Sequence, residues 1–222
     1  MKITIIPVNL VSEDLDELEK AVSSFNDVQT EFEAYQIDPM LFESESKTVH
    51  WPKLRDWILG VKSKGRVIAV TSDAFSDNWF SHTEGRTTAI STASWRDLFS
   101  PPGPQCYLLL EFTMACYFYA SNISESKSQA HIETKGCLLD ICKQKLDVKW
   151  KLRVGYLCSE HRALFIRNGG NEKHLKALEF LLDEVRRVSL GKRSAADLTA
   201  IFTHDPQPDV DKRPTFSREY LN

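Results

Sequence analysis

Three cysteines and one histidine have the types and spacing of a zinc site. Cys137, Cys142, Cys158 and His161 follow the pattern Cys-x4-Cys-x15-Cys-x2-His. Thiolate and imidazole are the ligands that tetrahedral zinc prefers, and two close pairs joined by a spacer can wrap one ion. We predict one structural Zn2+ ion, with a spacer folded as a small hairpin. His131 is the alternative fourth ligand, in place of His161.

A second group of polar residues lies between residues 72 and 86. Asp73, Asp77, His82 and Glu84 are types that serve in acid–base catalysis or metal binding. Loops are also rich in such residues for reasons of solvation alone. Both interpretations stay open at this point.

A basic run between Lys143 and Arg153 includes Trp150 and adjoins the predicted zinc site. Basic residues beside an aromatic side chain can contact nucleic acid. Asp140 and Asp147 dilute the run, which favours an ordinary solvated face. We therefore keep nucleic-acid binding as an unfavoured alternative.

The bulk composition fits one α/β domain. The chain has 222 residues, 42% hydrophobic content and a formal net charge of −3, which gives no general attraction to nucleic acid or anionic membrane. Five cysteines without an export signal indicate a reducing, cytoplasmic setting, and no apolar run has the length of a membrane span. We predict a single domain over 1–204 with a zinc module at 131–165 and C-terminal helices at 172–201, followed by a Pro-rich charged tail at 205–222.

The elements that must position these residues alternate along the first third of the chain. Hydrophobic periodicity predicts β-α-β-α-β over residues 1–71, then a long loop over 72–86 and a strand over 87–94. Residues 106–120 are apolar on nearly every face, which predicts a central buried helix. A further helix is expected over 172–189, and Ser194 is expected to cap a last short one.

Several of these stretches resemble the archaemetzincins, compact zinc metallopeptidases of the metzincin clan. The matching stretches are VIAVTSDAF, GRTTAISTASW, CYLLLEFTMACYFYA, CLLDIC and LCSEH. The resemblance covers roughly residues 1–165. It implies a metzincin-like mixed sheet with flanking helices, a small Cys3His structural zinc module and C-terminal helices. It also implies that the strand over 87–94 lines a bound peptide, and we expect this strand to accept a peptide by edge addition.

The resemblance fails on the catalytic helix, where the family carries HExxHxxGxxH. Aligning Glu111 with the family's glutamate puts Leu110 and Met114 at the first two histidine positions. Leucine cannot ligate zinc and methionine is a poor ligand for it. We therefore expect a pseudo-peptidase that binds a protein or peptide and acts as a regulatory component of a multi-protein system. The alternatives are a hydrolase with a non-standard site around Glu111 and a nucleic-acid-binding zinc module.

Overall fold

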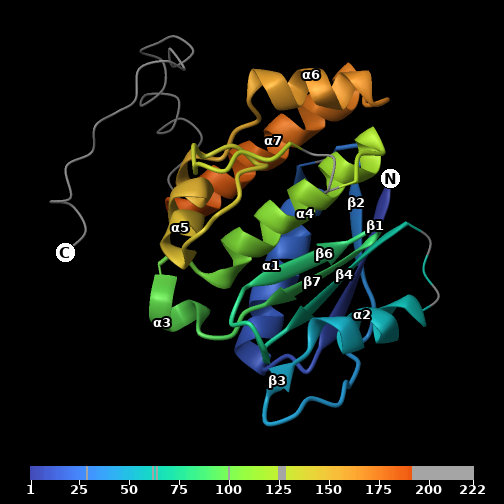
Figure 1. Ribbon diagram of the computed structural model, residues 1–222, viewed down its shortest axis with the longest axis vertical. Coiled ribbons are helices and arrows are strands. Elements are labelled where there is room, and N and C mark those ends of the chain that lie inside the picture. The colour runs from blue at the N-terminus through green and yellow to red at the C-terminus, as the bar shows by residue number, and fades with distance from the viewer. Residues whose placement is uncertain (29, 62, 64, 100, 125–128, 192–222) are drawn as a thin grey trace, which may run out of the picture. The chain divides into compact units, whose positions relative to one another are not determined.

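A five-stranded mixed sheet forms the centre of the molecule (Figure 1). The computed structural model describes residues 1–191, apart from 29, 62, 64, 100 and 125–128. The strand order is β2-β1-β4-β7-β6, with β6 antiparallel to β7 and the other neighbours parallel. These strands are β1 (Lys2–Val8), β2 (Glu33–Gln36), β4 (Arg66–Thr71), β6 (Ser81–Glu84) and β7 (Thr87–Ser91). A two-stranded sheet pairs β3 (Thr48–Val49) with β5 (Ala74–Phe75).

Helices cover both faces of the large sheet, so its central strands are apolar on both sides. Along β1, Ile3 and Ile5 pack into one core and Ile6 and Val8 into another, as the two-residue period of a strand requires. The first core contains side chains of α1 (Ser12–Asp27), α4 (Pro104–Ser121) and α7 (Glu172–Ser189). The second contains side chains of α2 (Trp51–Leu59). The described helices are completed by α3 (Trp95–Phe99), α5 (Lys145–Val154) and α6 (Ser159–Arg167).

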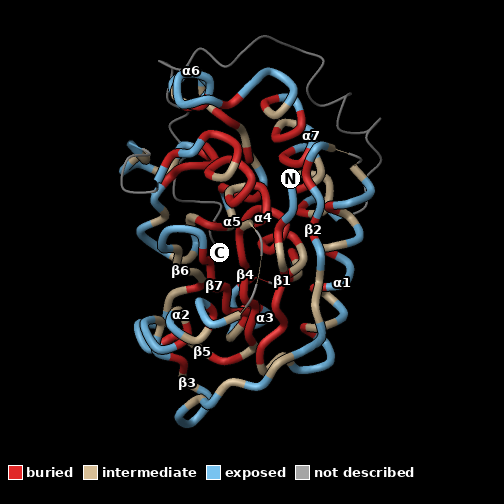
Figure 2. Tube along the Cα trace, turned by 90° about the vertical axis from the view of Figure 1, so that its right-hand side faces the viewer, coloured by how far each residue is buried: buried red, intermediate tan, exposed pale blue. Residues whose placement is uncertain are grey.

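The apolar helix predicted over 106–120 is α4, and its central position is confirmed. Fifteen of its 18 residues are buried. It packs between α1 and α7, and Figure 2 shows buried residues concentrated along it and along the inner strands. Asn122 ends the helix in the left-handed region at φ 54°, a conformation that asparagine tolerates. The α/β fold class is also confirmed, and the predicted order over residues 1–71 holds except that the short strand β3 lies between β2 and α2.

The region predicted as a long loop, 72–86, contains an edge strand. β6 pairs with β7, and this pairing leaves β7 between β4 and β6 inside the sheet. The expectation that residues 87–94 accept a peptide by edge addition is therefore wrong, because β7 already has a partner on each side. The strand at the edge is β6. Its sequence, SHTE, is polar because an edge strand keeps much of its surface in water, so it gave no apolar pattern.

The spacer of the predicted zinc module is the helix α5, and the prediction of a hairpin there is wrong. A capping box starts the helix, with Gln144 and Asp147 each bonding the other's backbone N–H. Val148 and Leu152 bury one face of the helix at a spacing of four residues. Only two apolar positions mark this face, which is why the sequence pattern was weak.

Some predictions lie outside the described residues. They are the helix capped by Ser194 and the tail over 205–222, so the predicted division at residue 204 stays a prediction. No helix in the described ranges is long and apolar enough to cross a membrane.

Candidate metal centre

Two histidines and two cysteines bring their ligand atoms together next to α6. They are His131, Cys137, Cys158 and His161, here called the metal cluster, and their ligand atoms all lie within 4.8 Å of one another. Nδ1 of His161 lies 3.3 Å from Sγ of Cys137 and 3.2 Å from Sγ of Cys158. Nε2 of His131 lies 3.3 Å from Sγ of Cys158. Among the described residues, no other group of three or more His, Cys, Asp and Glu side chains comes close enough to hold a metal ion.

Short backbone bridges bring these four residues together from distant positions. Cys137 pairs in parallel with Tyr156, with the N–H of Leu138 donating to the carbonyl of Tyr156 over 2.7 Å. This pairing places Cys137 beside the segment that leads into Cys158. Cys158 is the N-cap of α6, so His161 follows in the first turn on the same side. The hydroxyl of Tyr117 on α4 donates to the carbonyl of His161 over 3.0 Å and fixes α6 against the central helix.

The geometry and burial of the metal cluster fit a tetrahedral metal ion. A zinc ion with thiolates at about 2.3 Å and imidazoles at about 2.0–2.1 Å holds neighbouring sulfur and nitrogen ligands about 3.6 Å apart. The observed separations of 3.2 and 3.3 Å are close to this value. Cys137 and His161 are buried, whereas His131 and Cys158 are half-buried. The four side chains can therefore hold a metal ion at the edge of the core.

The two thiols of the metal cluster have pKa values shifted in opposite directions. The hydrogen bond between them lowers the pKa of Cys158 and raises the pKa of Cys137, and the bond with His161 also favours the Cys158 thiolate. The thiolate is the form that binds metal. A metal that binds both sulfurs therefore displaces any proton that the two thiols still hold.

The structure gathers three of the four ligands predicted from spacing, together with the alternative ligand His131. Cys142 is not among the gathered residues. Its side chain is half-buried and packs against the main core, and burial raises the pKa of its thiol to about 11. The charges that act on it come from Lys151, Asp147, Asp140 and Glu111.

Glu111, the catalytic candidate on α4, is enclosed beneath the edge strand. Its side chain is 4% exposed, and its Oε1 accepts a hydrogen bond from Ser81 of β6 over 3.4 Å. Tyr107 donates to the same serine over 2.8 Å. Burial raises the pKa of Glu111, while the positive charge of Lys151 opposes that rise. Oε2 is buried without a hydrogen-bond partner.

The helix positions next to Glu111 hold no metal ligand. Leu110 is buried in the core, and Met114 is half-buried and packs against it. Glu111 is therefore a buried acid with hydroxyl neighbours, and it does not belong to the metal cluster.

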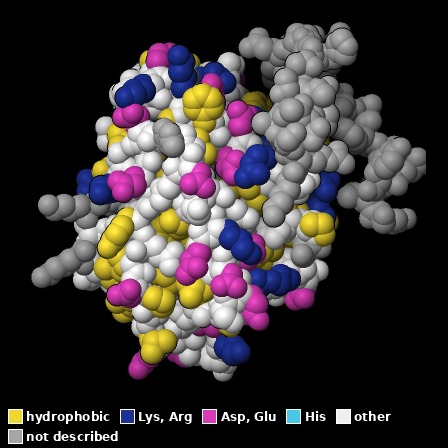
Figure 3. Space-filling view, turned by 180° about the vertical axis from the view of Figure 1, so that it is seen from behind, with side chains coloured by type: hydrophobic (Ala, Val, Ile, Leu, Met, Phe, Trp, Pro, Cys, Tyr) yellow, Lys and Arg dark blue, Asp and Glu magenta, His cyan; other side chains and the backbone are white. Residues whose placement is uncertain are grey.

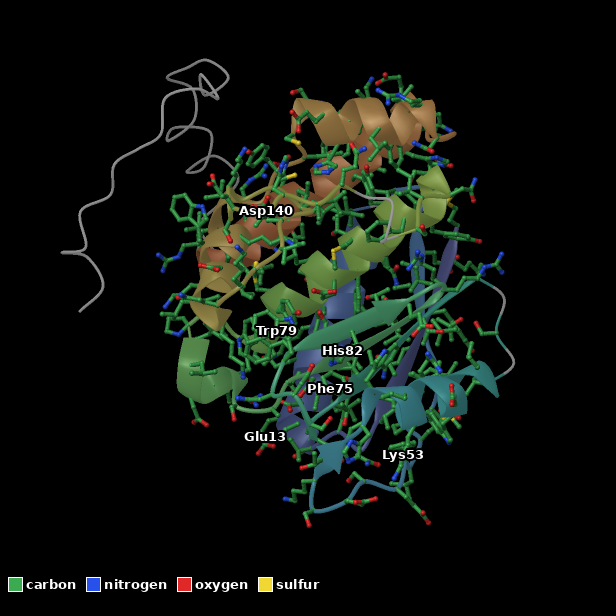
Figure 4. The ribbon with its side chains drawn as sticks, in the orientation of Figure 1. Glu13, Lys53, Phe75, Trp79, His82 and Asp140 are labelled. Atoms are coloured by element: carbon green, nitrogen blue, oxygen red, sulfur yellow. The ribbon has the colours of Figure 1, made fainter. Side chains whose placement is uncertain are left out.

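The polar residues of 72–86 have separate partners. Asp73 accepts a hydrogen bond from Asn9 over 2.9 Å, and Glu84 pairs with Arg55 over 2.6 Å. His82 lies 3.2 Å from Asp77 and stacks on the ring of Trp51. Figure 4 labels His82 near Phe75. These contacts tie loops and edges together, and the group does not converge on one point.

Two of the basic side chains between Lys143 and Arg153 contact other parts of the protein. Lys151 is buried and donates to the carbonyl of Asp140 over 3.1 Å. Lys145 lies 4.3 Å from the ring centre of Phe80. On the face shown in Figure 3, Lys and Arg side chains are interspersed with Asp and Glu.

The fold is similar to that of two solved archaemetzincins. The archaemetzincin of Methanopyrus kandleri gives a TM-score of 0.51 at 16% identity, covering 76% of this chain and 94% of that protein. The archaemetzincin of Archaeoglobus fulgidus gives a TM-score of 0.51 at 14% identity, covering 74% of this chain and 99% of that protein. No protein-family model matches the sequence, and no curated protein matches it either. The structural likeness shows an archaemetzincin-like fold.

Proposed function

We propose that this chain is a catalytically degenerate metallopeptidase-like protein that holds one structural zinc ion and binds an extended segment of a protein partner. The observation that supports this most is the pair Leu110 and Met114 on either side of Glu111. In the family that the chain resembles, those two positions carry zinc-binding histidines. Within the part of the chain that the structure describes, the metal cluster is the group that can hold an ion, and Glu111 lies outside it.

The zinc ion would be held by the metal cluster alone. Four protein ligands leave no open position for water, so a zinc ion bound there would stabilise the fold without activating a nucleophile. Glu111 is then left without an activated water to deprotonate. We propose that the chain acts in a multi-protein system of the cytoplasm, as a regulatory or binding component.

The edge strand β6 is the segment best suited to bind a partner. It has no second strand beside it among the described residues. The N–H of Ser91 donates to the carbonyl of Phe80, so hydrogen-bonded pairs with β7 fall at residues 80, 82 and 84. The backbone groups of Ser81 and Thr83 therefore point away from β7. An extended peptide can pair with these groups by strand addition.

Metal content and peptidase activity test the degenerate site. We expect one zinc ion per purified full-length chain by mass spectrometry, and none after His161→Ala. We also expect no hydrolysis of casein. Two zinc ions per chain, or casein hydrolysis that Glu111→Gln abolishes, would instead support the hydrolase alternative. The buried and unpartnered Oε2 of Glu111 is the observation that keeps that alternative worth testing.

A matched pair of variants on β6 tests strand addition. Thr83→Pro removes an outward N–H and leaves the hydrogen-bonded ladder to β7 intact. It also removes the 3.1 Å contact between the Thr83 and Thr88 hydroxyls, so Thr83→Val serves as the control. On an array of random decapeptides, we expect the full-length chain to bind a subset. Thr83→Pro should weaken that binding at least tenfold and Thr83→Val should preserve it. An equal effect of the two variants, or no bound peptide, would contradict strand addition.

A further inference from the structure

We propose that Asp140 is the positioning residue of the metal cluster. Its carboxylate holds the loop that carries Cys137, and its backbone holds the segment that carries His131. The inference rests on the proposed function in one respect, which is that the metal cluster binds zinc. Asp140 lies in the segment between α4 and α5, where Figure 4 labels it.

The carboxylate of Asp140 gathers the backbone that leads into Cys137. Its Oδ2 accepts hydrogen bonds from the N–H groups of Lys135 and Gly136, both over 2.5 Å, and from that of Cys137 over 3.0 Å. Successive N–H groups that converge on one anion form a compact, rigid loop. The position of the Cys137 thiol therefore depends directly on this side chain.

The backbone around Asp140 also holds His131, the other ligand that precedes α5 in the chain. Asp140 forms a parallel bridge with His131, and the N–H of Ile141 donates to the carbonyl of His131 over 2.9 Å. The N–H of Asp140 donates to the carbonyl of Cys137 over 3.0 Å. Asp140 and its neighbour Ile141 thus tie the backbones of Cys137 and His131 to one short segment.

Lys151 fixes Asp140 in turn to α5. Its buried ammonium donates to the carbonyl of Asp140 over 3.1 Å. The backbone conformation of this loop is also constrained at Gly136. Gly136 has φ 91°, and a Cβ there would lie 2.5 Å from Cγ1 of Val154 on α5. Val154 of α5 and the carboxylate of Asp140 together constrain the backbone conformation just before Cys137.

The second carboxylate oxygen of Asp140 is buried at an energetic cost. Oδ1 is buried and has no hydrogen-bond partner, and Asp140 is only 6% exposed. A buried, unpartnered oxygen is unfavourable for folding. The contacts of Oδ2 with the ligand loop are what offset this cost, so the residue is placed for the loop.

Zinc affinity of the full-length chain tests the inference. We expect Asp140→Asn to bind zinc about 10–100-fold more weakly than the wild type, measured by competition with a chromophoric chelator, as is typical when a partner of a metal ligand is lost. Asp147→Asn is the matched control, because Asp147 also accepts a backbone N–H in this module, that of Gln144 over 3.0 Å, but holds no ligand. Its zinc affinity should stay within about twofold of the wild type.

Cobalt binding gives a readout that a purely structural role would not move. The visible ligand-field bands of the Co2+-loaded chain report the geometry of the four ligands, and Asp140→Asn should shift them while Asp147→Asn should not. If Asp140→Asn does not fold, Asp140→Glu carries the same test, since its longer side chain cannot reach all three N–H groups in the same way.

The outcomes separate this inference from the proposed function. Equal zinc affinity of Asp140→Asn and the wild type, with unchanged cobalt bands, would overturn the role of Asp140 and leave the zinc site standing. A wild-type chain that binds neither metal would overturn the zinc site, and this inference with it.

Discussion

The fourth ligand of the metal cluster can be identified by comparing His131→Ala with Cys142→Ser. Spacing along the chain favours Cys142, but the structure places His131 3.3 Å from the Cys158 sulfur and turns Cys142 toward the core. We expect His131→Ala to lose most of the stabilisation that zinc gives. Cys142→Ser should respond to zinc as the wild type does.

The size of the effect follows from the number of ligands. Zinc binding stabilises small structural sites by about 10–16 kcal/mol, so one ligand of four contributes on the order of 3 kcal/mol, or about a hundredfold in affinity. In excess zinc, that loss appears as an equal loss of folding stability. For a chain of this size, about 3 kcal/mol lowers Tm by roughly 6–12 °C. Cys142→Ser alters only packing of a neutral, half-buried thiol, at a cost of about 1 kcal/mol with or without zinc.

The assay is thermal unfolding of each full-length variant, with saturating zinc and again with a chelator. The quantity compared is the difference in Tm between the two conditions, which removes any effect on packing that is independent of metal. A zinc-dependent difference that survives His131→Ala and disappears in Cys142→Ser would refute this reading of the ligand set.

Three further changes test other parts of the structure. Glu111→Gln should flatten the dependence of stability on pH. Burial raises the pKa of Glu111, so between about pH 4.5 and the raised pKa the folded wild type holds a proton that the unfolded chain releases. The stability of the wild type should therefore fall as pH rises through this range. Chemical denaturation of both proteins at several pH values measures this, and parallel curves would exclude it. Gly136→Ala should cost more than about 2 kcal/mol in thermal unfolding, because a Cβ there meets Val154 at a left-handed backbone position; a near-neutral result would argue against the loop geometry. Asp14→Asn should cost about 2 kcal/mol, because Asp14 is 3% exposed and pairs with Arg96, which is itself half in water; adding Arg96→Ala should then have little further effect.

Sequence periodicity predicted the elements whose burial leaves a strong pattern. β1, β4 and α4 are apolar on two faces or more, so Ile3, Ile68 and Leu109 mark them without help from tertiary context. β6 escaped detection because it lies at the edge of the sheet. Only Ser81 of its four residues is tied to α4, through hydroxyl contacts that have no hydrophobic pattern.

The candidate site was predictable as far as ligand type, and its exact membership was not. The spacing of ligand types identified Cys137, Cys158 and His161, because each belongs to a pair of ligand types that lie a few residues apart in the sequence. His131 joins them through a backbone bridge to Asp140, which sequence spacing does not encode. Asp140 itself read as one more charge in a mixed-charge segment. Its convergent N–H contacts depend on a left-handed turn at Gly136 that only the folded chain reveals.

The burial of α4 has a consequence for the order in which the chain matures on the ribosome. This helix packs against α1, made before it, and against α7, made some fifty residues later. Until residues 172–189 emerge, the nascent chain presents an apolar helix with one side open to water, which is the surface that chaperones recognise and that promotes aggregation. A fragment that stops before α7 is therefore expected to be insoluble even though it contains the whole sheet and the metal cluster. The last described helix completes the core that the first half of the chain begins.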